Sequence, residues 1–555
     1  MREPAVASLP GVERPELAPL VSVDAPLVAD GAWIIAHDGV PKARISEPVA
    51  AVAQYFTGEW TTTQIARHLG SPWEQGDVDA VAHSLRSAGM LVSAQGKRSR
   101  ERPRRWRFHP PLTVQFSLGN PGALFAALRP LSRIVMGAPG MVVGIVVVLA
   151  GVVAAVVGAG DIVRVLQQPI ALSVLLGLGV AIILTTVVHE VGHGAALSRF
   201  GGSPRRLGAM LFYLAPAFFC DVTDGWRLGR RGQRVAVALA GPAVHLFCAA
   251  VSMVVSRFVT EPLLHSGLVL YAIACLCIAV LNLLPFVQLD GYLALMSALD
   301  RPHLRRHAMR AASHTFGRLL LGTRNGEPAA NRDSAPSVWL VIYGVGCRLF
   351  PVVLVGFVLL RYSLTMAGLG VVPAAAYLLT LALVVGVVGV SLVRGVRAVV
   401  ARKPKPWRTA VTMTTAAVLG VLFLSIPIQP MNEVGFVRDS EEVRLVASTA
   451  DELPTAGVGV VLESNGILLR SPLGEATAGS EEPQREVVDV AALVPLNDSA
   501  LEATASTSTL VDMQTTQLLP RYGRATFADT RAQTIGAWVW QTFVIRPFSA
   551  FRSDN

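Results

Sequence analysis

Three residues near the middle of the chain have types and a spacing that suit zinc-dependent hydrolysis. His189, Glu190 and His193 form the pattern His-Glu-x-x-His. On an α-helix the two histidines lie one turn apart on the same face, so both imidazoles can bind one zinc ion while the glutamate serves as general base. The alternative is a pair of helical histidines with a glutamate between them by chance. The spacing favours a catalytic zinc site.

The segment that must carry this motif is an apolar run, Pro169 to Val188, that leads directly into His189. A run of about twenty apolar residues is long enough for a helix to cross a bilayer. An ionisable side chain at membrane depth costs roughly 2.5–3.5 kcal/mol on insertion scales, so such groups persist where they have partners or a catalytic role. A chance match would rarely fall at the end of a membrane span, and we therefore expect the motif to be functional.

A second polar motif closes a later apolar run. Its residues form the pattern Asn-x-x-Pro-x-x-x-Leu-Asp-Gly, from Asn282 to Gly291. A catalytic zinc needs three protein ligands and one open position, and a carboxylate at a helix end can complete a pair of imidazoles. We therefore expect Asp290 to be the third ligand. Taken alone, the Asp-Gly pair would indicate an ordinary turn at the C-terminal end of a helix.

Together the two motifs resemble the site-2 protease family of intramembrane zinc metalloproteases, and the resemblance covers roughly residues 170–300. It implies a Zn²⁺ ion held by His189, His193 and Asp290, with Glu190 as the catalytic base. It also implies a site-shaping role for four further residues, Asn282, Pro285, Gly241 and Pro242. The implied reaction is hydrolysis of a peptide bond in a membrane-associated substrate, whose helix must unwind locally before it is cut.

Two nearby features extend this resemblance. The family often has Asn three positions after its Gly-Pro turn, whereas His245 stands here. Two roles remain possible for His245: it donates a hydrogen bond to a metal ligand, or it is a packed side chain. Packing is favoured. The stretch from Phe218 to Trp226 resembles the subgroup of the family found with peptide-maturation enzymes, including the daptide kind. Its Asp221 and Asp224 are interpreted as structural or substrate-contacting residues.

Composition places these motifs in a polytopic membrane protein. Of the 555 residues, 52% are hydrophobic and only 15% are charged, and the mean hydropathy is +0.50. The net charge of +10 comes from basic residues between apolar runs, which indicates membrane topology rather than nucleic-acid binding. The five cysteines lie in or beside apolar segments, so no disulfide framework is expected. No cleavable signal peptide is recognised in the first thirty residues.

Seven spans are expected from the apolar runs, near residues 137–159, 169–193, 234–257, 263–285, 337–360, 366–394 and 408–429. Arg-rich segments follow alternate spans, at 199–233, 299–336 and 394–408. By the positive-inside rule, the N-terminus lies in the cytoplasm of a bacterial-type cell and the C-terminal region lies outside. Both motifs then lie towards the cytoplasmic side of a transmembrane metalloprotease domain, residues 137–429.

Ahead of the spans, residues 26–95 are predicted to form a small winged-helix-like α/β domain. A hairpin around Asp38-Gly39 precedes helices near 47–56, 61–69 and 75–88, and Met90 begins a last strand. The pattern resembles the PqqD-like domains that bind leader peptides in the maturation of ribosomally made peptides, on Glu47-Pro48-Val49, Phe56 to Thr61, Ile65-Ala66 and Leu85 to Leu91. A leader peptide is therefore an expected partner, and a DNA-binding winged helix is the alternative. Residues 1–25 are expected to be a flexible tail.

The segments on either side of the membrane domain are more polar. Residues 96–136 are expected to be a basic juxtamembrane linker that contacts the lipid bilayer, since six arginines lie between positions 98 and 107. Residues 430–555 are acidic, with 9 Arg, no Lys and 17 Asp or Glu. They are either a β-rich extracytoplasmic domain or a tail whose final aromatic residues return to the membrane surface. The Thr/Ser/Ala run from Ala503 to Leu510 is typical of a linker.

The predicted function is intramembrane proteolysis that removes the leader of a ribosomally synthesised, modified peptide. The alternatives are signalling cleavage of a membrane-anchored regulator of the anti-sigma-factor type, and a non-catalytic membrane protein that binds peptides. Signalling enzymes of the family commonly carry a PDZ domain, and no PDZ-like segment is recognised in this sequence. A leader tethered to residues 26–95 would raise the effective concentration of the scissile bond, to roughly the millimolar range for a short linker. Both points favour peptide maturation.

Overall fold

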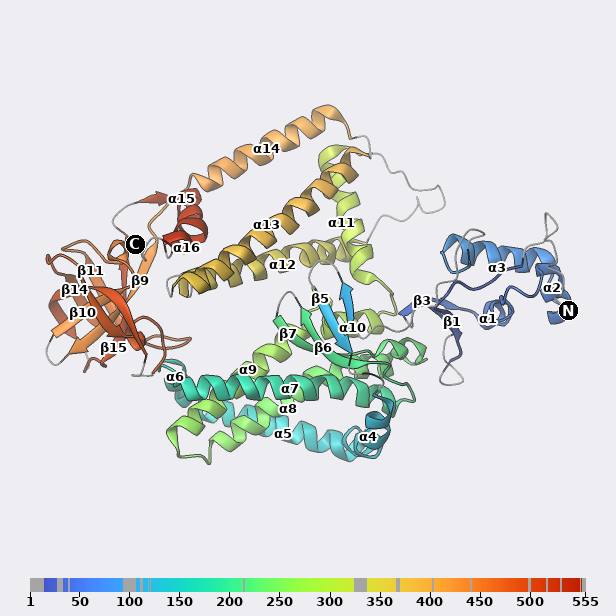
Figure 1. The fold of residues 1–555 in the computed structure, drawn as a ribbon, viewed down its shortest axis with the longest axis horizontal. Helices are drawn as coiled ribbons and strands as arrows, with labels where there is room; N and C mark the ends of the chain where they lie inside the picture. The colour runs from blue at the N-terminus through green and yellow to red at the C-terminus, as the bar shows by residue number, and fades with distance from the viewer. Residues whose placement is uncertain are drawn as a thin grey trace, which may run out of the picture. The chain divides into compact units, whose positions relative to one another are not determined.

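A computed structural model gives the fold of the chain (Figure 1). It describes residues 14–26, 33–37, 40–92, 106–109, 113–117, 119, 121–212, 215–323, 337–365, 370–401, 404–439, 442–497, 501–515, 518–529, 532–549 and 551. The chain divides into two compact units. The first comprises Met1–Ala150, Ile182–Val251 and Ala274–Pro302, and the second comprises Gly151–Ala181, Ser252–Ile273 and His303–Asn555. Both motifs of the candidate site fall in the first unit.

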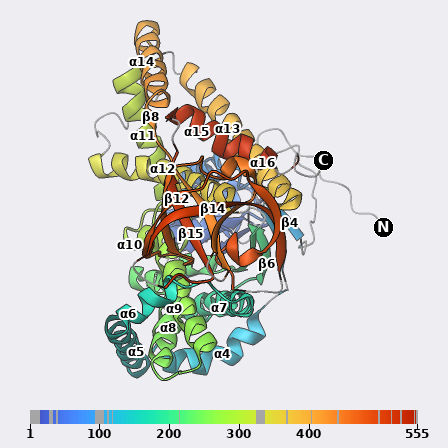
Figure 2. The ribbon, with the colours of Figure 1, turned by 90° about the vertical axis from the view of Figure 1, so that its left-hand side faces the viewer.

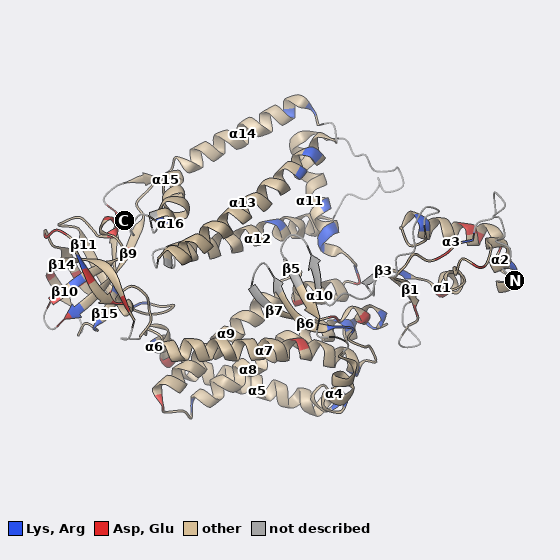
Figure 3. Cartoon of the chain, in the orientation of Figure 1, with Lys and Arg blue, Asp and Glu red and all other residues tan. Residues whose placement is uncertain are grey.

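Among the described residues, seven helices are long and apolar enough to cross a membrane, which confirms the expected polytopic fold. They are α5 (Ala138–Val157), α7 (Leu172–Arg199), α8 (Arg231–Ser256), α9 (Pro262–Leu283), α12 (Val338–Thr365), α13 (Val371–Val400) and α14 (Pro406–Leu424). Figure 3 shows little charge along their lengths. Many of their valines and leucines are exposed, and a surface of this kind is solvated by lipid rather than by water.

The N-terminal domain combines a three-stranded antiparallel sheet with three helices. The sheet has the order β1-β2-β3, and the elements are β1 (Val21–Asp24), β2 (Trp33–His37), β3 (Val40–Ile45), α1 (Glu47–Ala53), α2 (Thr62–Leu69) and α3 (Gln75–Ser87). The three helices agree with the prediction, but the third strand is β1, within the predicted tail, and the strand predicted from Met90 is reduced to a single bridge between Leu91 and Leu17. A capping box begins α2, because Thr61 accepts from the backbone N–H of Gln64 and the Gln64 side chain accepts from the N–H of Thr61. The predicted hairpin tip at Asp38-Gly39 lies outside the described residues.

The prediction of a flexible tail over residues 1–25 does not hold for residues 14–25. Leu17 forms a β-bridge with Leu91, and β1 pairs with β2 along its whole length. Leu17, Val21 and Val23 pack against the buried core of the domain. This apolar burial offsets the loss of chain entropy that would otherwise leave the segment disordered.

The linker predicted for residues 96–136 also contributes structure. Its strands β4 (Trp106–His109) and β5 (Thr113–Ser117) join β6 (Leu207–Phe212) and β7 (Ala215–Cys220) in a sheet of order β4-β5-β6-β7. Helix α4 (Gly122–Val135) follows, and its Phe125 ring packs so closely against Gly194 of α7 that a Cβ there would lie 2.2 Å from the ring. The arginines at 98–105 lie outside the described residues, so lipid contact by this run stays a prediction.

The C-terminal region folds as a closed β-sheet, which Figure 2 shows as a ring of strands. Its order is β10-β9-β15-β11-β12-β14-β13, and an additional pairing of β10 with β14 closes it. The strands are β9 (Met431–Asp439), β10 (Glu442–Ala447), β11 (Gly459–Ser464), β12 (Pro472–Ala478), β13 (Gln484–Asp489), β14 (Glu502–Thr515) and β15 (Tyr522–Ala528). Short strands β8 (Pro427–Ile428) and β16 (Gln533–Thr534) pair nearby, and the chain continues through α15 (Ile535–Trp540) and α16 (Arg546–Ser549).

The prediction of a linker at Ala503 to Leu510 is wrong. This run lies within β14, which pairs with β10, β12 and β13. Ser506 and Thr507 are each only 3% exposed. β-Branched threonines suit a pleated strand. Pairing with the neighbouring strands gives the backbone N–H and C=O groups hydrogen-bond partners, which in a polar linker would be water molecules.

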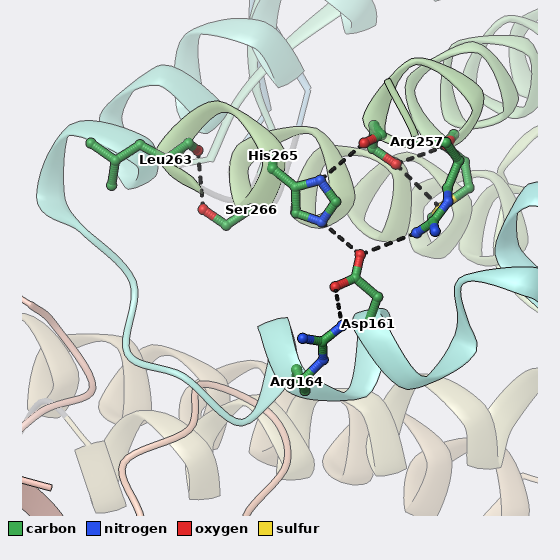
Figure 4. Close-up of polar contacts among 8 residues, drawn as sticks. Asp161, Arg164, Arg257, Leu263, His265 and Ser266 are labelled. Atoms are coloured by element: carbon green, nitrogen blue, oxygen red, sulfur yellow. Dashed lines mark hydrogen bonds and ion pairs between the residues drawn. The ribbon is translucent and has the colours of Figure 1, made fainter. Parts of the chain in front are cut away.

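Two further helices belong to the second unit, α6 (Ala159–Leu166) and α11 (Leu304–Leu321). Asp161 of α6 organises a polar cluster at one end of the spans, which Figure 4 shows. Its carboxylate lies 2.7 Å from Nε2 of His265, 3.2 Å from Arg257 and 3.0 Å from Arg164. The other ring nitrogen of His265 lies 3.0 Å from the carbonyl oxygen of Ser256. The cluster therefore ties α6 to the turn between α8 and α9.

Candidate metal centre

Helix α7 presents the first motif. Apolar residues dominate it up to Val188, and His189 and His193 follow one turn apart. The two residues are only 4% and 5% exposed, and their Nε2 atoms lie 3.2 Å apart. The structure thus brings the two imidazoles together, as the spacing predicts.

Asp290 reaches the same point from a different part of the chain. It is the first residue of the short helix α10 (Asp290–Ala298), which follows the end of α9. Its Oδ2 lies 3.1 Å from Nε2 of His189, and its Oδ1 lies 3.2 Å from Nε2 of His193. A Cβ at Gly291 would come within 2.0 Å of the carbonyl oxygen of Leu283, so only glycine lets α10 begin against α9. The Asp-Gly pair therefore does more than end a helix.

Two groups on α8 orient one histidine and leave space beside both: the carbonyl of Val237 and the backbone of Gly241. The carbonyl of Val237 lies 2.8 Å from Nδ1 of His193, so Nδ1 carries the proton and Nε2 keeps its lone pair. A Cβ built on Gly241 would lie 2.3 Å from Nε2 of His193 and 2.5 Å from Nε2 of His189. Glycine at this position leaves room directly beside the donor atoms. The Val237 carbonyl has no residue-type signal, so sequence reasoning missed it.

Glu190 is held by the sheet rather than by another side chain. Its Oε2 accepts a hydrogen bond of 2.8 Å from the backbone N–H of Cys220, the last residue of β7. The strands that follow α7 therefore fold back onto the helix and fix one oxygen of the expected base. No sequence motif marks this contact, because any residue except proline at position 220 would supply the same N–H.

The other predicted site residues lie close in sequence to the ligands. Pro242 is buried within α8 beside Gly241, whereas Asn282 and Pro285 are half-buried in the last turn of α9 and the segment after it. Their site-shaping roles stay predictions. Asp224 is 3% exposed and accepts from Arg227 and from the N–H of Ser203, at 2.9 Å each, which agrees with the structural interpretation.

His245 is packed, as favoured from the sequence, but it is packed unusually. It is fully buried, and its ring centroid lies 5.2 Å from that of His189. Within the part of the chain that the structure describes, neither of its ring nitrogens has a hydrogen-bond partner, and the same is true of Nδ1 of His189. Such unpaired buried nitrogens are uncommon and are typical of sites that hold a ligand or water.

The donor set fits a zinc ion. The ligand atoms of His189, His193 and Asp290 all lie within 4.8 Å of one another, and no other such group occurs among the described residues. Zinc held tetrahedrally at about 2.0–2.1 Å separates its ligand atoms by about 3.3 Å. The two Nε2 atoms lie 3.2 Å apart, and each lies 3.1–3.2 Å from one carboxylate oxygen of Asp290, Oδ2 for His189 and Oδ1 for His193, which is close to this value. Three protein ligands leave the fourth position open, as in catalytic rather than structural zinc sites.

The closeness of Gly241 to the histidines leads to a prediction. Gly241→Ala would place a methyl group among the Nε2 atoms, so we expect zinc content to fall severely while the helix itself tolerates alanine. Gly177→Ala, at an open position on α7, is the matched control and should keep full zinc. Metal analysis of the purified proteins checks this, and a fully loaded Gly241→Ala protein would contradict the geometry.

Comparison with known proteins agrees with a zinc site. The chain is similar to proteins named "Putative zinc metalloprotease Rip2" from the Erdman and H37Rv strains of Mycobacterium tuberculosis. The identity in each case is 31% over 155 residues, covering 23% of this chain and 58% of the relative. The chain therefore spans little more than half the length of these relatives. No family model and no solved structure matches the chain. The name of these relatives agrees with a metalloprotease, and the seven long apolar helices among the described residues agree with a protein of several membrane spans.

Proposed function

We propose that this protein is an intramembrane zinc metalloprotease of the site-2 protease type. The observation that carries the proposal is the convergence of His189, His193 and Asp290 beside Glu190, on helices that belong to a membrane domain. A buried cluster of two imidazoles and one carboxylate is expensive to place in apolar surroundings without a ligand. The similarity to Rip2 supports the class of enzyme.

The residues of the site divide the chemical work between them. A bound zinc ion would supply an activated water molecule and polarise the scissile carbonyl. Glu190 accepts a proton on Oε1, because Oε2 is already held by the N–H of Cys220, and returns it to the leaving amine. His193 stays a metal ligand through Nε2 because the Val237 carbonyl holds its Nδ1 proton. Gly241 keeps the space beside both imidazoles clear.

The proposed substrate is a membrane-associated precursor peptide whose leader binds the N-terminal domain. The domain belongs to the same compact unit as the metal centre, so a leader bound there is tethered near the scissile bond. Tethering by a short linker gives an effective concentration of roughly millimolar, which allows even a weakly recognised bond to be cut. Domain and metal centre lie on the cytoplasmic side in this proposal. A helical substrate must unwind first, so glycine near the cut should help.

The test uses the full-length protein in detergent with zinc and candidate precursors encoded near its gene. We expect mass spectrometry to show cleavage at one bond, loss of cleavage with a chelator, and recovery when zinc is restored. Removal of the leader from the precursor should slow cleavage strongly. Equal cleavage with and without the leader, or cleavage of an anti-sigma factor instead, would favour the signalling alternative. Binding of the leader without any zinc-dependent cleavage would favour a non-catalytic peptide receptor.

A further inference from the structure

Asp300 lies at the far end of the helix that begins with Asp290. It follows the C-terminal cap of α10 and has a positive φ of 51°. Its Oδ1 accepts hydrogen bonds of 2.7 Å from both Arg44 and Arg234, and Arg231 lies 3.7 Å from its Oδ2. Three guanidinium groups, one from β3 and two from the first turn of α8, therefore meet at one carboxylate.

Arg234 connects Asp300 to the other wall of the metal centre. Its side chain is only 4% exposed, and it also donates to the carbonyls of Leu228 and Gly229, at 2.7 and 3.3 Å. It lies in α8 one turn before Val237, whose carbonyl orients His193. Removing one partner of a buried ion pair is costly because the remaining charge is left without compensation. Asp300 thus joins α10 to α8 firmly.

Arg44 brings the N-terminal domain to the same carboxylate. It comes from β3, and its guanidinium also lies over the ring of Trp226, 5.5 Å from the centroid. A second set of contacts begins at the end of β1. There Asp24 pairs with Arg205 at 3.0 Å, and the carbonyl of Ala25 accepts from Arg227 at 2.8 Å.

The second set of contacts leads towards Glu190. Arg205 and Arg227 both pair with the buried carboxylate of Asp224, at 3.6 and 2.9 Å. Asp224 follows closely after Cys220, whose N–H holds Glu190. The N-terminal domain therefore contacts both the helix that presents the third ligand and the segment that fixes the base.

We propose that Asp300 is a positioning residue of the metal centre, and that docking of the N-terminal domain through Arg44 strengthens metal binding by holding α10 in place. The inference rests on the metal centre of the proposed function and adds the domain to it. Helix α10 has 9 residues, or about 14 Å at 1.5 Å per residue, and so short a helix moves as one body. If Asp300 is no longer held, α10 can move, and the carboxylate of Asp290 at its other end moves with it. Because coupling is reciprocal, bound metal must in turn strengthen docking of the domain.

The charge on Asp300 is present under ordinary conditions. Burial alone raises its pKa, but the hydrogen bond from Arg44 and the charges of Arg44, Arg234 and Arg231 outweigh burial, and the pKa lies below its ordinary value of 3.8. A group whose pKa is lowered on folding stabilises the fold above its unfolded pKa, and this stabilisation is lost as the pH falls through the folded pKa. Experiments near neutral pH therefore examine the fully ionised contact.

The test is the zinc affinity of the full-length protein in detergent at neutral pH, measured by competition with a chelator. Arg44→Gln breaks the contact between the N-terminal domain and Asp300 but leaves Arg234 paired, whereas Asp300→Asn removes the shared carboxylate. Both should weaken zinc binding by about 5-fold or more, within the usual range of coupling between sites. Arg67→Gln, an exposed arginine on α2 of the same domain, is the matched control and should change nothing. Asp300→Glu, which restores the charge, should recover part of the affinity.

A second measurement tests whether bound zinc strengthens docking of the N-terminal domain. Removal of zinc from the wild-type protein should speed hydrogen exchange in β3 and leave α2 unchanged. Thermal unfolding would reveal whether Asp300→Asn fails to fold. In that case Arg44→Gln and this exchange experiment test whether domain docking strengthens metal binding. Unchanged zinc affinity in a folded Arg44→Gln protein, with exchange in β3 indifferent to zinc, would overturn the inference even though Asp290→Ala still lost its metal. A wild-type protein that binds no zinc would instead overturn the proposed function.

Discussion

Glu190→Gln is expected to leave the protein folded and loaded with zinc while reducing cleavage by about 10²–10⁴-fold, the usual contribution of a general base. The amide oxygen of glutamine can still accept from the N–H of Cys220, so the contact with β7 is kept. What is lost is an oxygen able to take and return a proton. The rate of precursor cleavage, the zinc content and the unfolding temperature of the same preparation check this expectation.

Glu481→Gln is the matched control, because Glu481 is exposed, lies outside both the N-terminal domain and the metal centre, and the substitution is chemically the same. It should cleave at the wild-type rate. Cleavage at that rate by Glu190→Gln would falsify the assignment of the base. A loss of both zinc and folded protein in Glu190→Gln would show that the residue supports the structure, which the present account does not predict.

His189→Ala, His193→Ala and Asp290→Ala should each lower zinc affinity by at least about 100-fold. Losing only a hydrogen-bond partner of a ligand typically costs 10–100-fold, and loss of the ligand itself costs more. Each substitution also relieves crowding, because the ligand atoms of the three residues all lie within 4.8 Å of one another. We therefore expect the metal-free variants to remain folded. Metal analysis after dialysis against a weak chelator measures the effect.

Asp221→Asn is the control for Asp290→Ala, since Asp221 is a carboxylate of the same unit that contacts Thr223 and Arg206 instead of the cluster. It should keep its zinc. If Asp290→Ala retained full zinc and full activity, the third ligand would have to be sought elsewhere, and Asp221 and Asp224 would be examined first.

The parts of the site that the sequence could predict are those with a local signal. The one-turn spacing of His189 and His193 places them on one face of any helix, and the apolar run before them makes that helix a membrane span. Asp290 is predictable because a catalytic zinc needs three protein ligands and a carboxylate at the end of another apolar run can complete a pair of imidazoles. The structure brings these three together even though α7 and α10 are far apart in the chain.

The groups that complete the site carry no such signal. The N–H of Cys220 and the carbonyl of Val237 belong to the backbone, so their residue types carry no signal beyond the exclusion of proline at position 220. The space that Gly241 provides depends on how closely α8 approaches α7. Tertiary packing determines this distance, and the local sequence pattern does not predict it. Sequence resemblance pointed to Gly241, but only the structure shows what its missing side chain permits.

Long-range pairing explains the errors in the fold. The sequence around Leu17 and β1 has the composition of a flexible tail, but in the structure Leu17 pairs with Leu91 and β1 pairs with β2. In the same way, Ala503 to Leu510 has the composition of a linker, yet it lies in the longest strand of the closed sheet. Strand pairing of this kind is decided by neighbours distant in sequence, whereas helices and spans are decided within one window.

The most direct measurement of the central claim is X-ray absorption at the zinc edge on purified full-length protein, combined with the zinc-to-protein ratio. We expect one zinc per chain, surrounded only by nitrogen and oxygen at about 2.0–2.1 Å, with a weaker imidazole signal in any zinc that His193→Ala retains. A sulfur neighbour at about 2.3 Å would point to Cys220 or another cysteine as a ligand. That result, or a protein without stoichiometric zinc, would contradict a centre built from His189, His193 and Asp290.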